Sequence, residues 1–489
     1  MSKLASVVGA GIAGIASAIR LANKGFRVTV FEANSYPGGK LSEVVQDGYR
    51  FDAGPSLFTM PELVEELFEL AGEQAEDHFR YRRLAVNCHY FYEDGTFVEA
   101  FAESEDFVRE LAQKTGEAPQ NIQRALQQSA FLYDHLAELF MHRSLHRGST
   151  FVNRAALRSY LSLPRLDFFR TMHQANRQRF TDPRVVQLFN RYATYNGSDP
   201  HQTPATMNII PHLEFGRGAY FPERGMYSIT TSLCELAKRQ GVQFHFGARV
   251  ERILLQGGKV RGLRVNGENQ EADVVVSNMD VVSTYRRLLP NVAPPARLLN
   301  QPKSSSALIF YWGIRQAFES LDLHNIFFSR NYRAEFEHIF QHRSVHYDPT
   351  VYLNITSKYK PDDAPPGCEN WFTMINVPNN SGQDWDGLID RARDHIIAKL
   401  SRMLDTDVAA LIATESILDP RSIESKTSSS QGALYGNSSN NRYAAFLRHA
   451  NFSRKLRGLY FCGGSVHPGG GIPLSLLSAK IMADQVARV

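Results

Sequence analysis

The sequence is poor in cysteine and has no long apolar run. Its four cysteines among 489 residues lie far apart and form no CxxC pair, which argues against a disulfide framework or a zinc site. We therefore expect no bound metal. No uninterrupted apolar stretch approaches the roughly 18 residues of a membrane-spanning helix, and a strand pattern follows Lys3 at once, which leaves no room for a signal peptide. These absences predict a folded cytoplasmic protein.

Acidic residues are almost missing from one segment, residues 141–180. It contains eight arginines and one acid, so it carries a formal charge of +7 in a chain whose net charge is +4. The apolar residues among these arginines are Phe151, Leu157, Tyr160, Leu161, Leu166, Phe168, Phe169 and Met172. This mixture is typical of a surface that lies on anionic lipid, where each basic side chain contributes roughly 1 kcal/mol. A solvated helical face is the alternative. No recognised nucleic-acid-binding motif accompanies the arginines, so we expect no nucleic-acid partner.

A glycine motif opens the chain. Gly9, Gly11 and Gly14 follow a short apolar strand pattern at residues 4–8 and lead into a helix pattern. Glycines at this spacing allow a tight turn and a close approach of the backbone, and the amides at the helix start can bind a pyrophosphate. Glu32 ends the next strand pattern, where its carboxylate can accept hydrogen bonds from ribose hydroxyls. A purely structural glycine turn is the alternative, but the complete pattern predicts a dinucleotide site.

A second glycine turn distinguishes between the two common dinucleotides. Gly38, Gly39 and Lys40 closely follow the acidic residue, and a nicotinamide cofactor does not require them because it turns outward into a cleft there. FAD runs along this loop, where backbone amides and one cation can reach its phosphates. A third close-approach turn consists of Gly54, Pro55 and Ser56. The sequence therefore predicts FAD rather than NAD.

The C-terminal segment has the same order of patterns as the first glycine motif: a strand, a glycine-rich loop and a helix. A short apolar strand pattern at residues 458–462 leads into a glycine-dense loop, and a helix pattern follows at residues 474–489. The amides of such a loop can face a flavin, whose reduced ring carries negative charge. The candidate residues here are Gly463, Gly464, Gly471, Ile472 and Pro473.

Two groups of strand patterns occupy the middle of the chain. The first group comprises residues 242–246, 250–255, 260–265 and 272–277. The second comprises residues 307–313, 351–355 and 371–377. Aromatic residues are frequent in the second group, so its strands either line an apolar pocket or form ordinary core.

These motifs together resemble the bacterial-type phytoene desaturase family of FAD-dependent carotenoid desaturases, and the resemblance covers nearly the whole chain. Besides the glycine turns, it rests on residues 51–56, 221–225 and 277–280, and above all on the C-terminal loop at residues 463–473. The loop departs from the usual family pattern, and these departures, with residues 433–436, are more similar to the branch that introduces a C3–C4 double bond into 1-hydroxylated carotenoids. The departing residues are Gly464, Ser465, Val466 and Leu474.

The resemblance implies an α/β fold similar to that of the flavin amine oxidases. A doubly wound, Rossmann-type FAD domain would be formed by residues 1–80, 225–290 and 440–489. An inserted α+β domain, formed by residues 81–224 and 291–439, would bind the substrate and contact the membrane. The cofactor positions of the family match the glycines and the acid named above, and also Val250, whose strand could present backbone groups to adenine. A plain core valine is the alternative at that position.

The resemblance also implies a reaction. A hydride passes from an allylic C–H of the carotenoid to the flavin, and a proton leaves the neighbouring carbon. As proton acceptor we name His467, whose neutral imidazole suits this task, and Glu223 as a second candidate. Alternatively, His467 holds its loop by hydrogen bonds and Glu223 pairs with Arg224.

The substrate class has a consequence for location. A forty-carbon chain would lose roughly 0.8 kcal/mol per carbon unit if it were exposed to water, so it must pass directly from a bilayer into the protein. We therefore expect peripheral contact with the cytoplasmic face of the membrane. Other functions stay open: a phytoene desaturase, a carotene isomerase or other flavin amine oxidase-like enzyme, and a prenyl-lipid escort protein. The intact flavin motifs argue against the escort protein. The sequence carries no signal for an oligomeric state.

Overall fold

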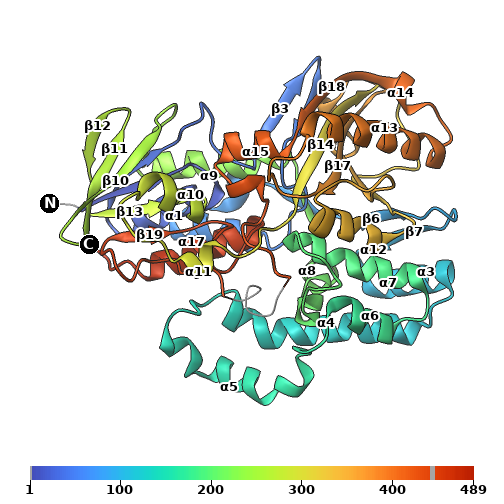
Figure 1. Ribbon diagram of the computed structural model, residues 1–489, viewed down its shortest axis with the longest axis horizontal. Coiled ribbons are helices and arrows are strands. Elements are labelled where there is room, and N and C mark those ends of the chain that lie inside the picture. The colour runs from blue at the N-terminus through green and yellow to red at the C-terminus, as the bar shows by residue number, and fades with distance from the viewer. Residues whose placement is uncertain (1–2, 441–446) are drawn as a thin grey trace.

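The computed structural model describes residues 3–440 and 447–489. Six residues of the predicted cofactor segment 440–489, residues 441–446, therefore lie outside the described part. A parallel sheet and both chain ends occupy one side of the molecule, a larger sheet occupies the other, and a group of helices lies below them (Figure 1).

A five-stranded parallel sheet contains the first glycine motif. Its strands, in spatial order, are β19 (Leu459–Phe461), β13 (Val274–Ser277), β1 (Leu4–Val8), β2 (Arg27–Phe31) and β9 (Gln243–His245). One face is covered by apolar side chains of α1 (Ile12–Asn23), α2 (Glu62–Leu70), α9 (Tyr227–Arg239) and α17 (Ile472–Asp484). All four residues of β13 are buried, as the continuous apolar run predicted.

The other face of this sheet is covered differently. A three-stranded antiparallel sheet of β10 (Val250–Gln256), β11 (Lys259–Val265) and β12 (Glu268–Glu271) packs there, together with the short helix α10 (Val281–Ser283). Its side chains form a second core with those of β1, β2, β13 and β19. The predicted fold class is confirmed, with strands rather than long helices on this face.

A seven-stranded sheet forms the centre of the other half. Its strands, in spatial order, are β18 (Ile412–Leu418), β14 (Ser306–Ile314), β17 (Glu369–Val377), β16 (Val351–Ile355), β15 (His324–Phe327), β6 (Val86–Phe91) and β7 (Phe97–Phe101). Neighbours are antiparallel except β15 and β6. One face packs against α13 (Trp385–Met403), and part of the other packs against helices.

The aromatic strand residues divide between the two faces of this sheet. Phe310, Trp312 and Trp371 are buried in the core beside α13. Tyr311 and Phe372 lie on the opposite face and line a cavity. Both interpretations of the aromatic strands are therefore correct, each for one face, because side chains alternate along a strand.

Helices cover the lower side of the molecule. They are α3 (Ser104–Thr115), α4 (Pro119–Phe140), α5 (Arg154–Leu161), α6 (Met172–Arg179), α7 (Pro183–Asn190) and α8 (Pro211–Phe215). In Figure 1, α5 is the lowest element and stands away from the sheets. The remaining elements are β3 (Glu43–Gln46), β4 (Tyr49–Asp52), β5 (Tyr81–Arg83), β8 (Tyr220–Pro222), α11 (Ala296–Leu299), α12 (Tyr332–Glu337), α14 (Val408–Leu411) and α15 (Pro420–Thr427).

Candidate functional site

A cavity of about 1080 Å³ lies between the two halves. Its walls come from the N-terminal glycine turns, the C-terminal loop and one face of the seven-stranded sheet. Ligand sites usually measure about 300–1,000 Å³. The size and the two kinds of wall suit a cofactor and a second ligand together.

The first glycine turn leaves no space for side chains. A Cβ on Gly14 would lie 2.2 Å from the carbonyl oxygen of Gly9, and a Cβ on Gly11 would lie 2.5 Å from Oδ1 of Asn278. Gly9 has φ +94°, a backbone conformation that side chains disfavour. Gly11 and the first turn of α1 line the cavity, and amides in a first turn have no acceptor within their helix. Gly14 does not line the cavity, so its role is close packing of the helix on the strand.

Glu32 is buried at the end of β2 and faces the same space. Its Oε2 accepts a hydrogen bond from the amide of Ala10 at 2.7 Å, and its Oε1 accepts one from the amide of Asn34 at 2.9 Å. Oε1 also accepts a hydrogen bond from Nδ2 of Asn34 at 3.0 Å. These contacts fix the carboxylate, and Oε2 keeps a lone pair for a ligand hydroxyl.

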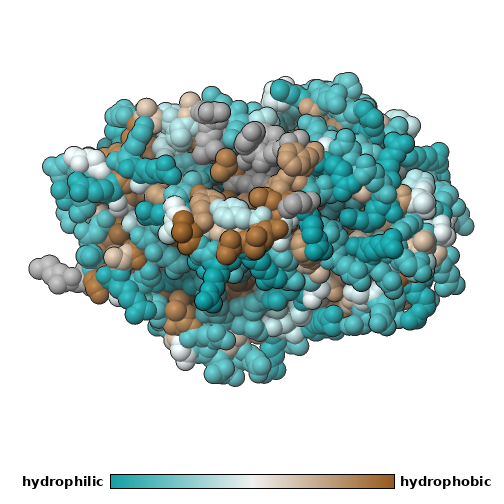
Figure 2. All heavy atoms as spheres, turned by 90° about the horizontal axis from the view of Figure 1, so that it is seen from below, coloured by the Kyte–Doolittle hydropathy of each residue, from teal (hydrophilic) through white to brown (hydrophobic). Residues whose placement is uncertain are grey.

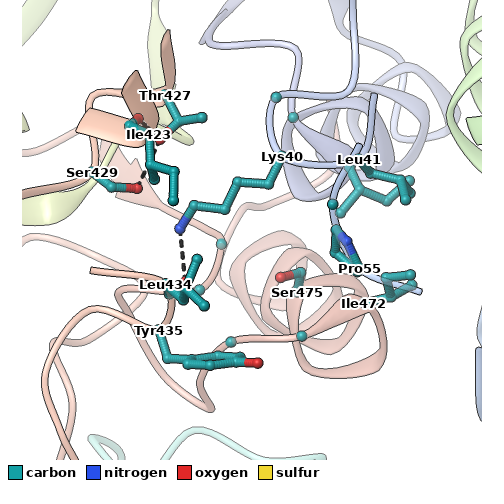
Figure 3. Close-up of a pocket in the computed structure, with 18 of the residues that line it drawn as sticks. Lys40, Leu41, Pro55, Ile423, Thr427, Ser429, Leu434, Tyr435, Ile472 and Ser475 are labelled. Carbon is teal, nitrogen blue, oxygen red and sulfur yellow. Dashed lines mark hydrogen bonds between the residues drawn. The ribbon is translucent and has the colours of Figure 1, made fainter. Parts of the chain in front are cut away.

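Lys40 reaches across the cavity to the C-terminal part of the chain. Its Nζ donates to the carbonyl oxygens of Leu434 at 2.7 Å and Ala433 at 3.3 Å. Figure 3 shows this side chain extending from the N-terminal segment to Leu434. Burial lowers the pKa of Lys40 to about 8, against the opposing effect of Asp280. The ammonium group therefore ties two cavity walls together and brings positive charge to the cavity.

The other predicted cofactor residues also line the cavity. They are Gly38, Gly39, Gly54, Pro55, Ser56, Val250, Gly463, Gly464, Gly471, Ile472 and Pro473. A Cβ at Gly38, Gly54 or Gly463 would lie 2.0, 1.8 or 2.6 Å from another atom of the protein. These tight glycine turns, a fixed acidic residue and a buried cation fit FAD, which would lie along β1, β2 and the C-terminal loop. Their contacts with the cofactor stay a prediction. The described residues contain no group of three or more potential ligand side chains that could hold a metal ion.

The two candidate proton acceptors lie elsewhere. Glu223 is exposed, and neither Glu223 nor His467 lines the cavity. His467 is buried, and its Nε2 lies 2.7 Å from the carbonyl oxygen of Arg143. Burial lowers the pKa of His467 to about 4, so its ring is neutral at pH 7. This position does not support proton acceptance and favours the alternative role, in which His467 holds the loop.

Sequence reasoning missed several polar residues of the cavity wall. Asn87, Arg191, Glu214, His324 and Tyr352 all line the cavity, and they come from separate elements. Their spacing along the chain carries no motif. The one available signal is Arg191, a charged residue within an apolar and aromatic run at residues 185–195.

A parallel nucleotide-binding sheet, glycine turns that fit FAD and room for a second ligand define the class of flavin-dependent oxidoreductases. The chain belongs to the family of flavin containing amine oxidoreductases, whose family model matches residues 12–487. Its cofactor is FAD. The chain is 50% identical to a 1-hydroxycarotenoid 3,4-desaturase of a Flavobacterium over 99% of both chains. It is 33% identical to a 4,4'-diapolycopene oxygenase of a Methylomonas over 98% of this chain and 97% of that relative.

Solved structures show the same fold. An oxidoreductase from Methanosarcina mazei has a TM-score of 0.65 at 16% sequence identity, with 98% of this chain and 100% of that chain covered. Cyclohexylamine oxidase from Brevibacterium oxydans has a TM-score of 0.63 at 16% identity, with 99% of both chains covered. These neighbours show the fold of the chain alone, because their sequence identity is low.

Proposed function

We propose that this protein is an FAD-dependent carotenoid desaturase that introduces a C3–C4 double bond into a 1-hydroxycarotenoid. The observation that carries the proposal is the 50% identity to a 1-hydroxycarotenoid 3,4-desaturase along 99% of both chains. The matched length includes the segments that form both kinds of cavity wall. The 33% identity to a carotenoid oxygenase supports the same class of substrate.

The residues of the chain have three tasks in this reaction. FAD, when bound, supplies the acceptor for a hydride from an allylic C–H. The glycine turns, Glu32 and Lys40 would hold it at the end of the parallel sheet. The apolar wall orients the polyene and excludes water, and a cation that develops on the substrate is delocalised over its conjugated chain, so a strong base is unnecessary. His467 and Glu223 lie away from the cavity walls, and we propose that His467 holds the C-terminal loop in place.

The proposed binding of FAD and substrate also predicts how the chain divides into domains. We propose that residues 1–80, 225–290 and 440–489 bind FAD, and that residues 81–224 and 291–439 bind the substrate. The cavity lies where these two sets of residues meet, which brings the reacting bond to the flavin.

We further propose that the protein contacts the cytoplasmic face of a membrane through a membrane-contact region, defined as residues 151–169. Val152, Leu161 and Phe169 in this region are 85%, 77% and 82% exposed. Figure 2, which views the molecule from the side of α5, shows hydrophobic side chains among hydrophilic ones on this face. No helix in the described ranges is both long and apolar enough to cross a bilayer.

The membrane-contact region is connected to the cavity through α4. Ala156 of α5 packs in one cluster with Leu139 and Phe140 of α4, and Ser159 donates a hydrogen bond to the carbonyl oxygen of His135. Leu136 and Phe140 line the cavity. An apolar substrate could thus pass from lipid to cavity beside the end of α4.

Product analysis tests the proposed activity. The purified flavoprotein is incubated with liposomes that contain an acyclic or monocyclic 1-hydroxycarotenoid. We expect a product with one added C3–C4 double bond and a red-shifted absorption spectrum. Stepwise conversion of phytoene to lycopene, with the hydroxylated substrate untouched, would instead identify a phytoene desaturase. A product that gains oxygen would identify an oxygenase, and a colourless protein without FAD would support an escort function.

A further inference from the structure

Three buried polar side chains line the same cavity, and two of them belong to the neighbouring parallel strands β6 and β15. Asn87 belongs to β6, His324 belongs to β15, and Arg191 follows α7 in a short 3-10 helix. Asn87 is 3% exposed and His324 is 4% exposed, yet both line the cavity. The pairing of β6 with β7 is irregular between Val86 and Cys88, so the regular alternation of side chains is interrupted at Asn87. This irregularity explains how both Asn87 and Cys88 line the cavity.

Asn87 is an amide without partners. Within the described part of the chain, neither its Oδ1 nor its Nδ2 makes a hydrogen bond, although both atoms are buried. A buried polar group left unsatisfied costs about 1–3 kcal/mol. An asparagine in this state on a cavity wall is suited to a ligand that both donates and accepts a hydrogen bond.

The neighbours of His324 determine which of its ring nitrogens carries the proton. The amide nitrogen of Asn354 donates to the carbonyl oxygen of Leu323 at 2.8 Å, which orients the amide, and lies 3.2 Å from Nδ1 of His324. The hydroxyl of Tyr352 lies 2.7 Å from the same Nδ1. Nδ1 is therefore the acceptor, and Nε2 carries the hydrogen. Nε2 is buried and has no partner among the residues described.

The charges around this group indicate a neutral ligand. Burial and the nearby Arg191 lower the pKa of His324 to about 3, so the ring is uncharged. Arg191 lies 3.5 Å from the carboxylate of Glu214 and donates to the hydroxyls of Tyr90 at 2.7 Å and Tyr195 at 3.1 Å. Because the charges of Arg191 and Glu214 compensate each other, these polar side chains carry no net positive charge that would attract an anion. It suits an alcohol.

The polar group is linked to the cofactor wall. Tyr352, which binds His324, also shares a hydrogen bond of 2.7 Å with Ser56. Ser56 lies in the third glycine turn, which we assign to the FAD site. In a 1-hydroxycarotenoid, one CH₂ group separates the carbon that bears the hydroxyl from the reacting C3–C4 bond. The hydroxyl must therefore bind directly beside the cofactor.

We propose that Asn87 and His324, with Arg191 beside them, form a subsite that binds the terminal hydroxyl of the carotenoid. Asn87 accepts the hydroxyl hydrogen through Oδ1, and Nε2 of His324 donates to the hydroxyl oxygen. This subsite places the C3–C4 bond at the flavin and selects hydroxylated over unhydroxylated ends. The proposal rests on the proposed function for the identity of the substrate.

Substitution of Asn87 tests the subsite by substrate preference. The flavoprotein and its Asn87→Leu variant are compared on a 1-hydroxycarotenoid and on the same carotenoid without the hydroxyl. We expect kcat/KM for the hydroxylated substrate to fall roughly 10- to 100-fold in the variant, the loss of one to two hydrogen bonds in a buried site. The unhydroxylated substrate should lose nothing. Met374→Leu, another change in the cavity wall, is the control and should leave the preference unchanged.

Two further measurements separate binding from folding. Asn87→Leu should retain FAD and should not lower the melting temperature, because it removes two unsatisfied polar atoms. His324→Gln, which keeps an N–H donor, should retain more of the preference than His324→Leu. An equal loss on both substrates, or an unchanged preference in Asn87→Leu, would refute the subsite.

A failure of the proposed function can be distinguished from a failure of the subsite. If the wild-type protein does not desaturate the hydroxylated substrate, the proposed function is wrong. The subsite is then tested by measuring equilibrium binding of the two carotenoids to the flavoprotein, with quenching of protein fluorescence as the signal. Tighter binding of the hydroxylated ligand that disappears in Asn87→Leu would support the subsite, and equal binding would refute it.

Discussion

Glu32 illustrates how much one side chain does at the cofactor end of the cavity. Its carboxylate accepts hydrogen bonds from two backbone amides, which hold the end of β2 and the glycine turn in a fixed relation. Its Oε2 keeps a lone pair that could accept a hydrogen bond from a ribose hydroxyl of FAD. Loss of this side chain is therefore expected to weaken FAD binding and to loosen the glycine turn.

We expect Glu32→Ala to weaken FAD binding by roughly 10- to 100-fold, since hydrogen bonds to a charged group contribute about 1.5–3 kcal/mol. Gly11→Val should have at least as large an effect, because its Cβ would lie 2.5 Å from Oδ1 of Asn278. Titration of the apoprotein with FAD measures both. The control is Glu235→Ala on the exposed side of α9. Unchanged affinity in both variants would show that this loop does not hold the cofactor.

The structure around helix α5 changes the interpretation of the basic segment, residues 141–180. Several arginines of residues 141–180 are engaged within the protein: Arg143 pairs with Glu138, Arg170 pairs with Asp167, and Arg165 stacks on Phe131. Arg154 and Arg158 on α5 are exposed beside Leu157 and Leu161. The apolar side chains of this helix are therefore expected to contribute more to membrane contact than the net charge.

Apolar and basic substitutions on α5 should act differently on liposome binding. The double variant Leu157→Ser and Leu161→Ser should weaken cosedimentation with anionic liposomes by about tenfold or more at any salt concentration, because buried leucines contribute about 1.5–3 kcal/mol each. Arg154→Glu with Arg158→Glu should weaken it mainly at low salt, where charges are least screened.

The matched control for the α5 variants changes two exposed apolar residues outside residues 151–169. Val45 and Tyr347 are 68% and 70% exposed, so Val45→Ser with Tyr347→Ser removes a similar apolar area elsewhere. FAD content should be the same in all three double variants. If the control variant loses as much liposome binding as the leucine variant, residues 151–169 are not the contact region.

Buried neutral histidines make the stability of the folded protein dependent on pH. Burial lowers the pKa of His467 and of His449 to about 4 in the folded protein. In the unfolded chain a histidine titrates near 6.5. Between these values the unfolded chain binds more protons, so stability is complete above about pH 6.5 and is lost as pH falls toward 4.

We expect the melting temperature of the flavoprotein to fall between pH 7 and pH 5, with about 2 kcal/mol lost per buried histidine at pH 5. His467→Gln can keep the hydrogen bond to the carbonyl oxygen of Arg143 but cannot be protonated in this range. It should therefore lose less stability than the wild type over the same pH interval. Melting curves at constant ionic strength measure the difference, and parallel pH dependence in both proteins would contradict it.

Local sequence patterns predicted the strands and glycine turns around the first strand of the parallel sheet. The strand, the glycine turn, the helix and Glu32 lie within about thirty consecutive residues, so their geometry is set by local rules that a sequence displays. The C-terminal loop is readable for the same reason. The strands that were predicted agree with the structure within two residues, because their apolar runs are bounded by turn residues. Strands β6, β7, β15 and β18 of the seven-stranded sheet were not predicted.

Which side chains meet could not be predicted from the sequence. Asn87, Arg191 and His324 are more than 100 residues apart, and the strand pairings and helix packing that join them leave no periodic trace in the sequence. The direction of the His467 side chain, the face on which each aromatic residue lies and the pairing of each arginine were decided in the same way. These properties depend on contacts between distant segments, and a local pattern contains no information about the partner that packing supplies.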